Sequence, residues 1–207
     1  FAGIRLFSVR RQAPIKKEVY RRFGSIDVVL LDTRRAPLRQ WVRYLSAADH
    51  REWRAIRARK SAKLFLASRA MALPMARHLD RRKQHLTRLP TGQPVLRKGF
   101  ISISRCYPFV AFALARKPVG IDLELIRRDD DLIDAVAPSF SAEEQTEIRK
   151  SAFRASCFCR IWSRKEALAK LAGTGISTDL AALDTLHPEA CLRSLQLRGR
   201  YWLSLAG

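Results

Sequence analysis

Residues 119–125 constrain the fold of this chain more than any other stretch, because apolar and acidic residues alternate along them. A period of two is typical of a β-strand, in which successive side chains point to opposite faces. On such a strand Asp122 and Glu124 share one face, and the apolar residues next to them share the other. The pattern predicts a strand with two neighbouring carboxylates directed to solvent or to a metal ion.

A second charged stretch, residues 162–170, has the spacing of a helix. Residues four apart are neighbours on a helix, so Trp162, Glu166 and Lys170 share a side. Glu166 would complete an oxygen-rich cation site with the two strand carboxylates, and such a site suits Mg²⁺. Taken singly, each stretch is also explained by a solvated strand face or by ordinary surface charges on a helix.

In their order and separation the two stretches resemble the signature of Sfp-type 4′-phosphopantetheinyl transferases. That signature is an (Ile/Val)-Gly-(Ile/Val)-Asp-x-Glu segment followed by Trp-Ser-x-Lys-Glu-Ala-x-x-Lys. Residues 140–144 are similar to the Phe-Ser-x-x-Glu segment of the family, and residues 173–176 are similar to its Gly-x-Gly-(Leu/Ile) turn. Looser matches upstream extend the resemblance over residues 27–180.

The resemblance implies an α/β fold of the α+β type. Two similar α/β subdomains would form a pseudo-dimer, with the active site in the cleft between them. We expect a basic N-terminal arm over residues 1–25, an N-terminal subdomain over residues 26–116 and a C-terminal subdomain with the metal site over residues 117–207. The sequence itself shows no internal repeat.

The resemblance also implies an activity. The 4′-phosphopantetheine moiety of coenzyme A, the co-substrate, would be transferred to a serine of an apo acyl or peptidyl carrier protein, releasing adenosine 3′,5′-bisphosphate. Such holo-acyl-carrier-protein synthase chemistry serves fatty acid, polyketide or nonribosomal peptide biosynthesis. A Mg²⁺ ion held by Asp122, Glu124 and Glu166 would neutralise the charge of the phosphate oxygens, as phosphoryl transfer requires.

By family position, the candidates for catalysis are Glu144, Glu166 and Lys170. Glu144 would take the proton of the serine, although a metal-held Glu166 is the alternative base, acting directly or through water. A capping box with Ser141 is the structural explanation for Glu144. Lys170 would pair with a phosphate oxygen or the leaving group, and Lys165 would help to bind the same region.

Arg69, Ser104 and Arg105 are weaker candidates for contacts with coenzyme A. Arg105 stands where relatives carry a histidine that contacts a phosphate, and a guanidinium can bind phosphate bidentately. Gln93 stands where relatives carry a lysine, so one expected phosphate-binding cation is absent. For Arg69 a structural salt bridge is the competing interpretation.

The positive charge lies almost wholly in the first half of the chain. Of the net charge of +21, residues 1–100 carry +19 (25 Lys and Arg against 6 Asp and Glu) and residues 101–207 carry +2 (15 against 13). Such a field attracts polyanions, and it would steer an acidic carrier protein to the enzyme. The alternatives are a basic nucleic-acid-binding protein and a non-catalytic relative that binds coenzyme A or the carrier. Aromatic residues are only 9% of the chain and no nucleic-acid-binding motif appears, which disfavours the former.

Cysteine use and hydropathy indicate a cytoplasmic protein. The four cysteines form no Cys-x-x-Cys pair and no zinc-like spacing with histidines, as in proteins of a reducing compartment. No run approaches the ~18 apolar residues that cross a bilayer, and the first residues lack a signal-peptide pattern. We expect a monomer without membrane association.

Periodicity and turn residues predict the remaining elements. Strands are expected over residues 26–31, 100–104, 107–115, 192–197 and 201–205. Helices are expected over residues 38–45, 46–60, 61–79, 131–136, 141–158 and 162–172. Pro74 should kink or divide its helix, residues 86–98 should form a loop, and Gly173 should end the helix before it. Residues 100–125 should form one β-ribbon, the spine of the molecule.

Overall fold

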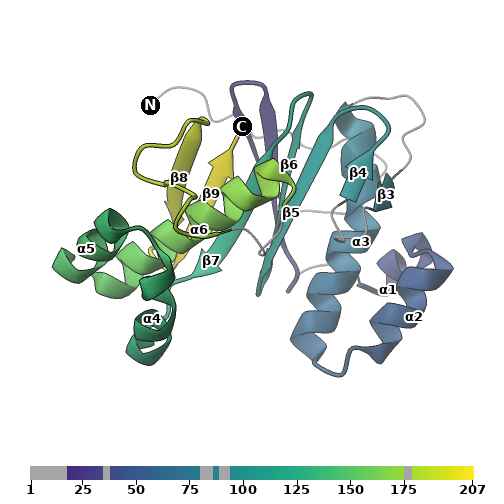
Figure 1. Ribbon diagram of the computed structural model, residues 1–207. Coiled ribbons are helices and arrows are strands. Elements are labelled where there is room, and N and C mark those ends of the chain that lie inside the picture. The colour runs from purple at the N-terminus through teal and green to yellow at the C-terminus, as the bar shows by residue number, and fades with distance from the viewer. Residues whose placement is uncertain (1–17, 35–37, 80–85, 89–93, 175–178) are drawn as a thin grey trace. The chain divides into compact units, whose positions relative to one another are not determined.

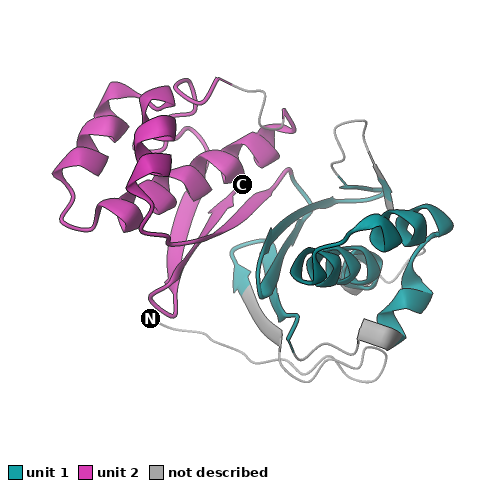
Figure 2. Ribbon diagram, turned by 90° about the horizontal axis from the view of Figure 1, so that it is seen from below, with its two compact units in different colours: residues 1–117 teal, residues 118–207 magenta. Residues whose placement is uncertain are grey.

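The computed structural model describes residues 18–34, 38–79, 86–88, 94–174 and 179–207. The chain divides into two compact units, Phe1–Lys117 and Pro118–Gly207 (Figure 2). Each unit has an antiparallel sheet and one long helix packed against it (Figure 1). Segregation of helices to one face of an antiparallel sheet confirms the predicted α+β class.

The first unit is built on a six-stranded sheet of order β1-β2-β6-β5-β4-β3. The strands are β1 (Glu18–Phe23), β2 (Ile26–Asp32), β3 (Leu86–Arg88), β4 (Pro94–Leu96), β5 (Phe100–Cys106) and β6 (Phe109–Ala115). The central strand β6 is apolar and buried along its whole length. Such a strand, buried on both faces, reads in the sequence as a continuous apolar run.

The helices of this unit are α1 (Leu38–Trp41), the 3₁₀ helix η1 (Val42–Tyr44), α2 (Ala47–Ala55) and α3 (Arg59–Leu79). Helix α3 packs on β5 and β6, and α1 and α2 pack on α3. Leu66, Phe112 and Trp41 are among the side chains that join these layers in one apolar cluster. Ser46 caps α2 as predicted, since its hydroxyl accepts a hydrogen bond from the amide of Asp49.

The second unit has the three-stranded sheet β7-β9-β8. Its elements are β7 (Gly120–Leu125), α4 (Asp130–Val136), the 3₁₀ helix η2 (Ala137–Ser139), α5 (Ala142–Lys150), α6 (Arg154–Ala172), β8 (Leu192–Leu197) and β9 (Tyr201–Ala206). Helix α6 crosses all three strands, and α4 and α5 pack on α6 (Figure 1). Gly173 ends α6 in the left-handed conformation, as predicted.

Two segments without clear periodicity form strands instead. Residues 18–23 of the expected arm form β1, an edge strand that pairs with β2 in a hairpin and is tied to it by the ion pair of Arg22 with Asp27. Residues 86–98, expected as a loop, contain the three-residue strands β3 and β4 at the opposite edge of the sheet. These short strands form because pairing with a neighbouring strand satisfies their backbone hydrogen bonds. Their side-chain pattern does not reveal this pairing.

Three other expectations are corrected. The expected ribbon over residues 100–125 is split, because β7 leaves the sheet of β5 and β6 after Pro118 and pairs with β9. The expected helix over residues 141–158 is two helices, since α5 ends at Lys150 and α6 begins at Arg154. Pro74 does not divide α3, whose buried face continues on both sides of it.

Within the described residues, no helix is both long and apolar enough to span a lipid bilayer.

Candidate active site

Strand β7 carries two of the predicted metal ligands on the face that α6 covers. Gly120, Asp122 and Glu124 lie on the same side of the strand, because every second residue of a strand faces the same way. A Cβ added at Gly120 would point into the backbone of α6. Asp122 is therefore buried, with only 3% of its surface exposed, rather than open to solvent. The carboxylates face a helix that brings its own charged side chains.

Gly120 allows β7 and α6 to approach this closely. A Cβ at this position would lie 1.8 Å from the carbonyl oxygen of Ala167 and 2.7 Å from the amide nitrogen of Leu171. Both are helix backbone atoms, which cannot move aside as a flexible side chain can. The glycine of the motif thus sets the spacing between the strand of Asp122 and the helix of Glu166.

Lys170 joins the carboxylates of the two elements. Its Nζ lies 2.6 Å from Oδ1 of Asp122 and 4.0 Å from Oε2 of Glu166, one turn earlier on α6. The Lys170 side chain keeps 28% of its surface exposed. The partly exposed Lys170 side chain lies beside buried carboxylates, so its ammonium group can contact an incoming anion without a movement of α6.

Two of the carboxyl groups, those of Glu124 and Glu166, have raised pKa values. Burial, followed by the charge of Asp122, raises the pKa of Glu124 to about 7, while Lys170 opposes that shift. Burial also raises the pKa of Glu166, and Asp122 adds to the rise. The raised pKa values mean that burial disfavours the ionised forms of Glu124 and Glu166. A bound cation would be favoured there.

The donor chemistry of Asp122, Glu124 and Glu166 fits Mg²⁺, which takes carboxylate oxygens and keeps several waters. Among the residues that the structure describes, no three His, Cys, Asp or Glu side chains lie close enough together to hold an ion. The ammonium group of Lys170 instead contacts Asp122 directly. These residues suit the metal by the chemistry of their donor atoms.

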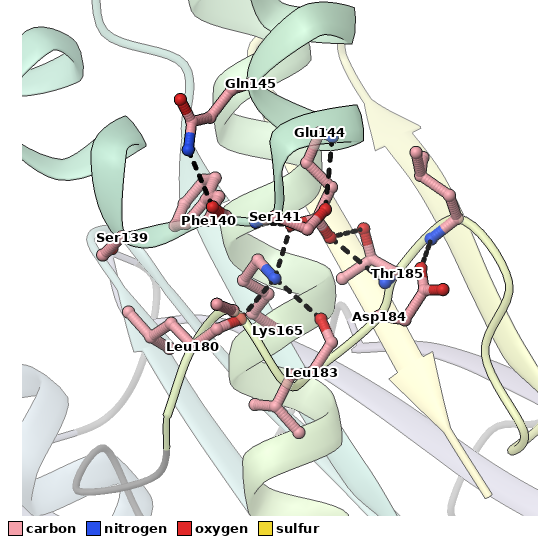
Figure 3. A network of polar contacts seen from close by, with 12 residues as sticks. Ser139, Phe140, Ser141, Glu144, Gln145, Lys165, Leu180, Leu183, Asp184 and Thr185 are labelled. Carbon is pink, nitrogen blue, oxygen red and sulfur yellow. Dashed lines mark hydrogen bonds and ion pairs between the residues drawn. The ribbon is translucent and has the colours of Figure 1, made fainter.

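Glu144 and Lys165, expected to act on the serine and the phosphates, bind each other instead (Figure 3). Lys165 Nζ lies 2.6 Å from Oε2 of Glu144, and both side chains are 0% exposed. The other Glu144 oxygen accepts hydrogen bonds from the amide and hydroxyl of Thr185, and Lys165 also donates to the carbonyl oxygens of Leu180 and Leu183. Both side chains are buried and bound to each other, and their expected roles toward the serine and the phosphates stay predictions.

The predicted capping box at the start of α5 is confirmed. The amide of Glu144 donates to Oγ of Ser141, and the amide of Ser141 donates to Oε2 of Glu144. The structural explanation considered for Glu144 is therefore the one that the structure shows.

The upstream candidates for coenzyme A contacts all belong to the first unit. Arg69 pairs with Asp49 at 3.2 Å and Glu52 at 3.7 Å, so the competing salt-bridge interpretation describes it. Ser104 is buried in β5, and the next residue, Arg105, is exposed. Burial of part of its side chain, followed by the charge of Arg69, lowers the pKa of Arg105. The position of Gln93 lies outside the described residues.

A cavity of about 200 Å³ lies beside Glu124 in the second unit. Apart from Glu124, Arg127 and Asp129 its lining is mostly apolar, from the end of β7, α4 and α6: Leu125, Leu132, Ile133, Val136, Ala155, Phe158, Cys159 and Trp162. The carboxylate of Glu124 thus stands at the border between the charged cluster and an apolar recess.

Sequence reasoning missed three contributions to this region. Gly120 was part of the motif but had no assigned role, although a glycine within a strand often marks a place where another backbone approaches closely. Arg127, in the charged loop after β7, partly opposes the rise in the pKa of Glu124. Thr185 anchors Glu144, and nothing in its local sequence indicates a partner 41 residues away.

Comparison with known proteins agrees with this geometry. Residues 118–204 match the 4′-phosphopantetheinyl transferase superfamily. The chain is also similar to the 4′-phosphopantetheinyl transferase psf-1 of Bacillus pumilus, at 34% identity over 111 residues. The matched region covers 51% of this chain and 47% of psf-1, so it spans about half the length of that relative.

Proposed function

We propose that this protein transfers the 4′-phosphopantetheine moiety of coenzyme A to a serine of an apo carrier protein and releases adenosine 3′,5′-bisphosphate. The observation that carries the proposal is the assembly of Asp122, Glu124, Glu166 and Lys170 from β7 and α6. All four lie in the segment that matches the family. Unlike a solvated surface, this arrangement concentrates buried acidic oxygens beside a cation.

Asp122, Glu124 and Glu166 would hold Mg²⁺, which when bound neutralises negative charge on the phosphate oxygens. Burial, together with the charge of Asp122, raises the pKa values of Glu124 and Glu166, and this supports the assignment because a bound cation favours the ionised carboxylates. Lys170 would exchange its contact with Asp122 for a phosphate oxygen, because its side chain keeps 28% of its surface exposed. Such a point charge stabilises the phosphate as it is transferred.

The base that takes the serine proton would be Glu166. Glu144 is enclosed by its partners, which leaves Glu166 as the remaining candidate. Burial raises the pKa of Glu166, and this raised basicity favours proton transfer. In the first unit, exposed Arg105 would bind a phosphate of coenzyme A, while Arg69 would support it through its carboxylate partners.

Mass spectrometry of the carrier tests the proposal. Incubation with apo carrier protein, coenzyme A and Mg²⁺ should add one phosphopantetheine mass to the carrier, and chelation of divalent ions should prevent the gain. No gain with acyl and peptidyl carriers of several pathways would reject the activity. Retained binding of coenzyme A or carrier would then favour the non-catalytic relative.

Isosteric variants test the site. Asp122→Asn and Glu166→Gln should each lower the transfer rate by about 10²-fold or more, because each loses a charged ligand without losing volume. Asp131→Asn, on the exposed side of α4, is the matched control and should transfer at the wild-type rate. Near-normal rates of either site variant would refute the assigned cluster.

A further inference from the structure

We propose that the buried Glu144–Lys165 pair is a positioning device: it fastens residues 179–187 to α6 and fixes the rotation of α6 that directs Glu166 and Lys170 toward β7. The proposal rests on the proposed function only in what Glu166 and Lys170 do once they are positioned. The pair itself contacts no substrate, since both side chains are fully buried.

Residues 179–187 contain no helix or strand, so their backbone groups need other partners. Two of the local turns are closed by Asp179, which accepts from the amide of Ala181, and by Asp184, which accepts from the amides of Leu186 and His187. These bonds shape the segment but do not attach it to the rest of the unit.

The buried pair makes that attachment through three backbone groups (Figure 3). Lys165 donates to the carbonyl oxygens of Leu180, at 2.6 Å, and Leu183, at 2.7 Å, and Glu144 accepts from the amide of Thr185 at 3.1 Å. A buried ion pair is retained only where further hydrogen bonds satisfy both charges. Here those further bonds all reach the same irregular segment or the cap of α5, so the pair joins α5, α6 and the segment.

Aromatic packing encloses the pair. The ammonium group of Lys165 lies 5.0 Å from the centre of the Phe140 ring, within reach of a cation–π interaction. Phe140 in turn stacks on Phe158 and Trp162 of α6. The lysine is therefore held in one position from several sides, as a positioning group must be.

Lys165 and Glu166 are consecutive on α6, and consecutive helical side chains diverge by about 100° around the axis. Tethering Lys165 therefore fixes the direction of Glu166. On the side of β7, the close contact of Gly120 with Ala167 and Leu171 holds the same turn. A rotation of α6 by ~10° would move a side-chain oxygen by about 1 Å, and a displacement of ~1 Å at a reacting centre can cost about 10²-fold in rate.

The double variant Glu144→Gln/Lys165→Met tests the proposal. It removes both buried charges together, so no uncompensated charge remains, and the urea midpoint should stay near that of the wild type. Hydrogen exchange of the amides in residues 181–187 should accelerate at least tenfold, because two carbonyls and one amide lose charged partners. Mg²⁺ affinity should fall about tenfold or more, as for other groups that orient metal ligands.

The matched control is Glu147→Gln/Arg160→Met. Arg160 and Glu147 form the other ion pair between α5 and α6, but it supplies none of the three backbone bonds. Exchange in residues 181–187 and Mg²⁺ affinity should both stay at wild-type values. An equal effect of both double variants would show that any helix-to-helix pair suffices, and would overturn the proposal.

A milder variant covers the case in which the double variant does not fold. Thr185→Val keeps the ion pair but removes one hydroxyl bond to Glu144, so exchange should accelerate several-fold without loss of the fold. Unchanged exchange would overturn the proposal.

A readout without metal or substrate separates this proposal from the proposed function. The ¹³C signals of the Asp122 and Glu166 carboxyl groups at fixed pH should shift in Glu144→Gln/Lys165→Met and not in the control. Unmoved signals would overturn the positioning role even if transfer were demonstrated. If the wild-type protein transferred nothing to any carrier, the proposed function would fail while shifted signals would still support the positioning role.

Discussion

Glu124 is a residue of the cluster whose charge changes near neutral pH. Burial and the charge of Asp122 raise its pKa from 4.5 to about 7. A carboxyl group whose pKa is higher in the folded than in the unfolded state stabilises the fold at low pH, and this stabilisation is lost as the pH rises. The relevant window runs from the unfolded to the folded value, about pH 4.5 to 7.

In the absence of divalent cations, the free energy of unfolding should therefore fall between about pH 4.5 and pH 7. Glu124→Gln should remove part of this fall, on the order of 2 kcal/mol after allowance for partial exposure. Urea denaturation across this range measures the effect, and Glu189→Gln, at an exposed position, is the control. Parallel pH profiles of wild type and Glu124→Gln would contradict the raised pKa.

At the scale of elements, the approach of β7 to α6 determines whether the charged residues meet. The apolar residues of β7 and the C-terminal stop of α6 were predictable, but the spacing of the two elements depends on Gly120. Strand alternation alone placed Asp122 on a face open to solvent or metal. The helix that covers this face comes from a segment more than 40 residues later, so only tertiary packing buries the carboxylate.

Gly120→Ala should destabilise the protein by about 1–3 kcal/mol or more, because the added methyl group collides with helix backbone. It should also weaken Mg²⁺ binding, since the strand must move away from α6. Urea unfolding and Mg²⁺ titration measure the two effects.

Gly199→Ala is the control for Gly120→Ala. Space around Gly199 is open, but its φ of +64° disfavours other residues. Its cost should be about 1 kcal/mol, with unchanged Mg²⁺ affinity. Normal Mg²⁺ affinity of Gly120→Ala would show that the spacing of β7 and α6 does not set the site.

At the scale of the whole molecule, the basic charge of the first unit is the feature that the proposed metal site does not use. Exposed basic residues concentrate at the end of α2 and the start of α3, with Glu52 among them already near Arg69. They are Arg51, Arg54, Arg57, Arg59 and Lys60. A surface of this kind raises the association rate of an acidic partner and loses its effect as salt is added.

Arg54→Glu/Arg57→Glu should raise the KM for an acidic carrier about tenfold with unchanged kcat, and should flatten its salt dependence. Arg149→Glu/Lys150→Glu, at exposed positions of the second unit, is the charge-matched control. Steady-state kinetics from low to high salt measures both. Equal effects would indicate a general dependence on net charge, and competition by a random oligonucleotide would favour the nucleic-acid alternative.

The sequence by itself determined the local features: the alternation of β7, the caps at Ser46, Ser141 and Gly173, and a motif that points to one family. These depend on neighbours a few residues apart, which a pattern can reveal. It could not find the edge strand β1 or the break between α5 and α6, because partners elsewhere in the fold complete them.

Only the tertiary structure decided which of the motif's charges are available for chemistry. Lys165 and Glu166 are adjacent in the sequence, yet one is enclosed by Glu144 and the carbonyls of residues 180 and 183, and the other joins Asp122 and Lys170. The physical reason is the direction of the side chains around α6, since successive residues face different layers of the unit. The alternating carboxylates of β7 are accordingly one wall of the proposed site, and the packing of α6 supplies the other.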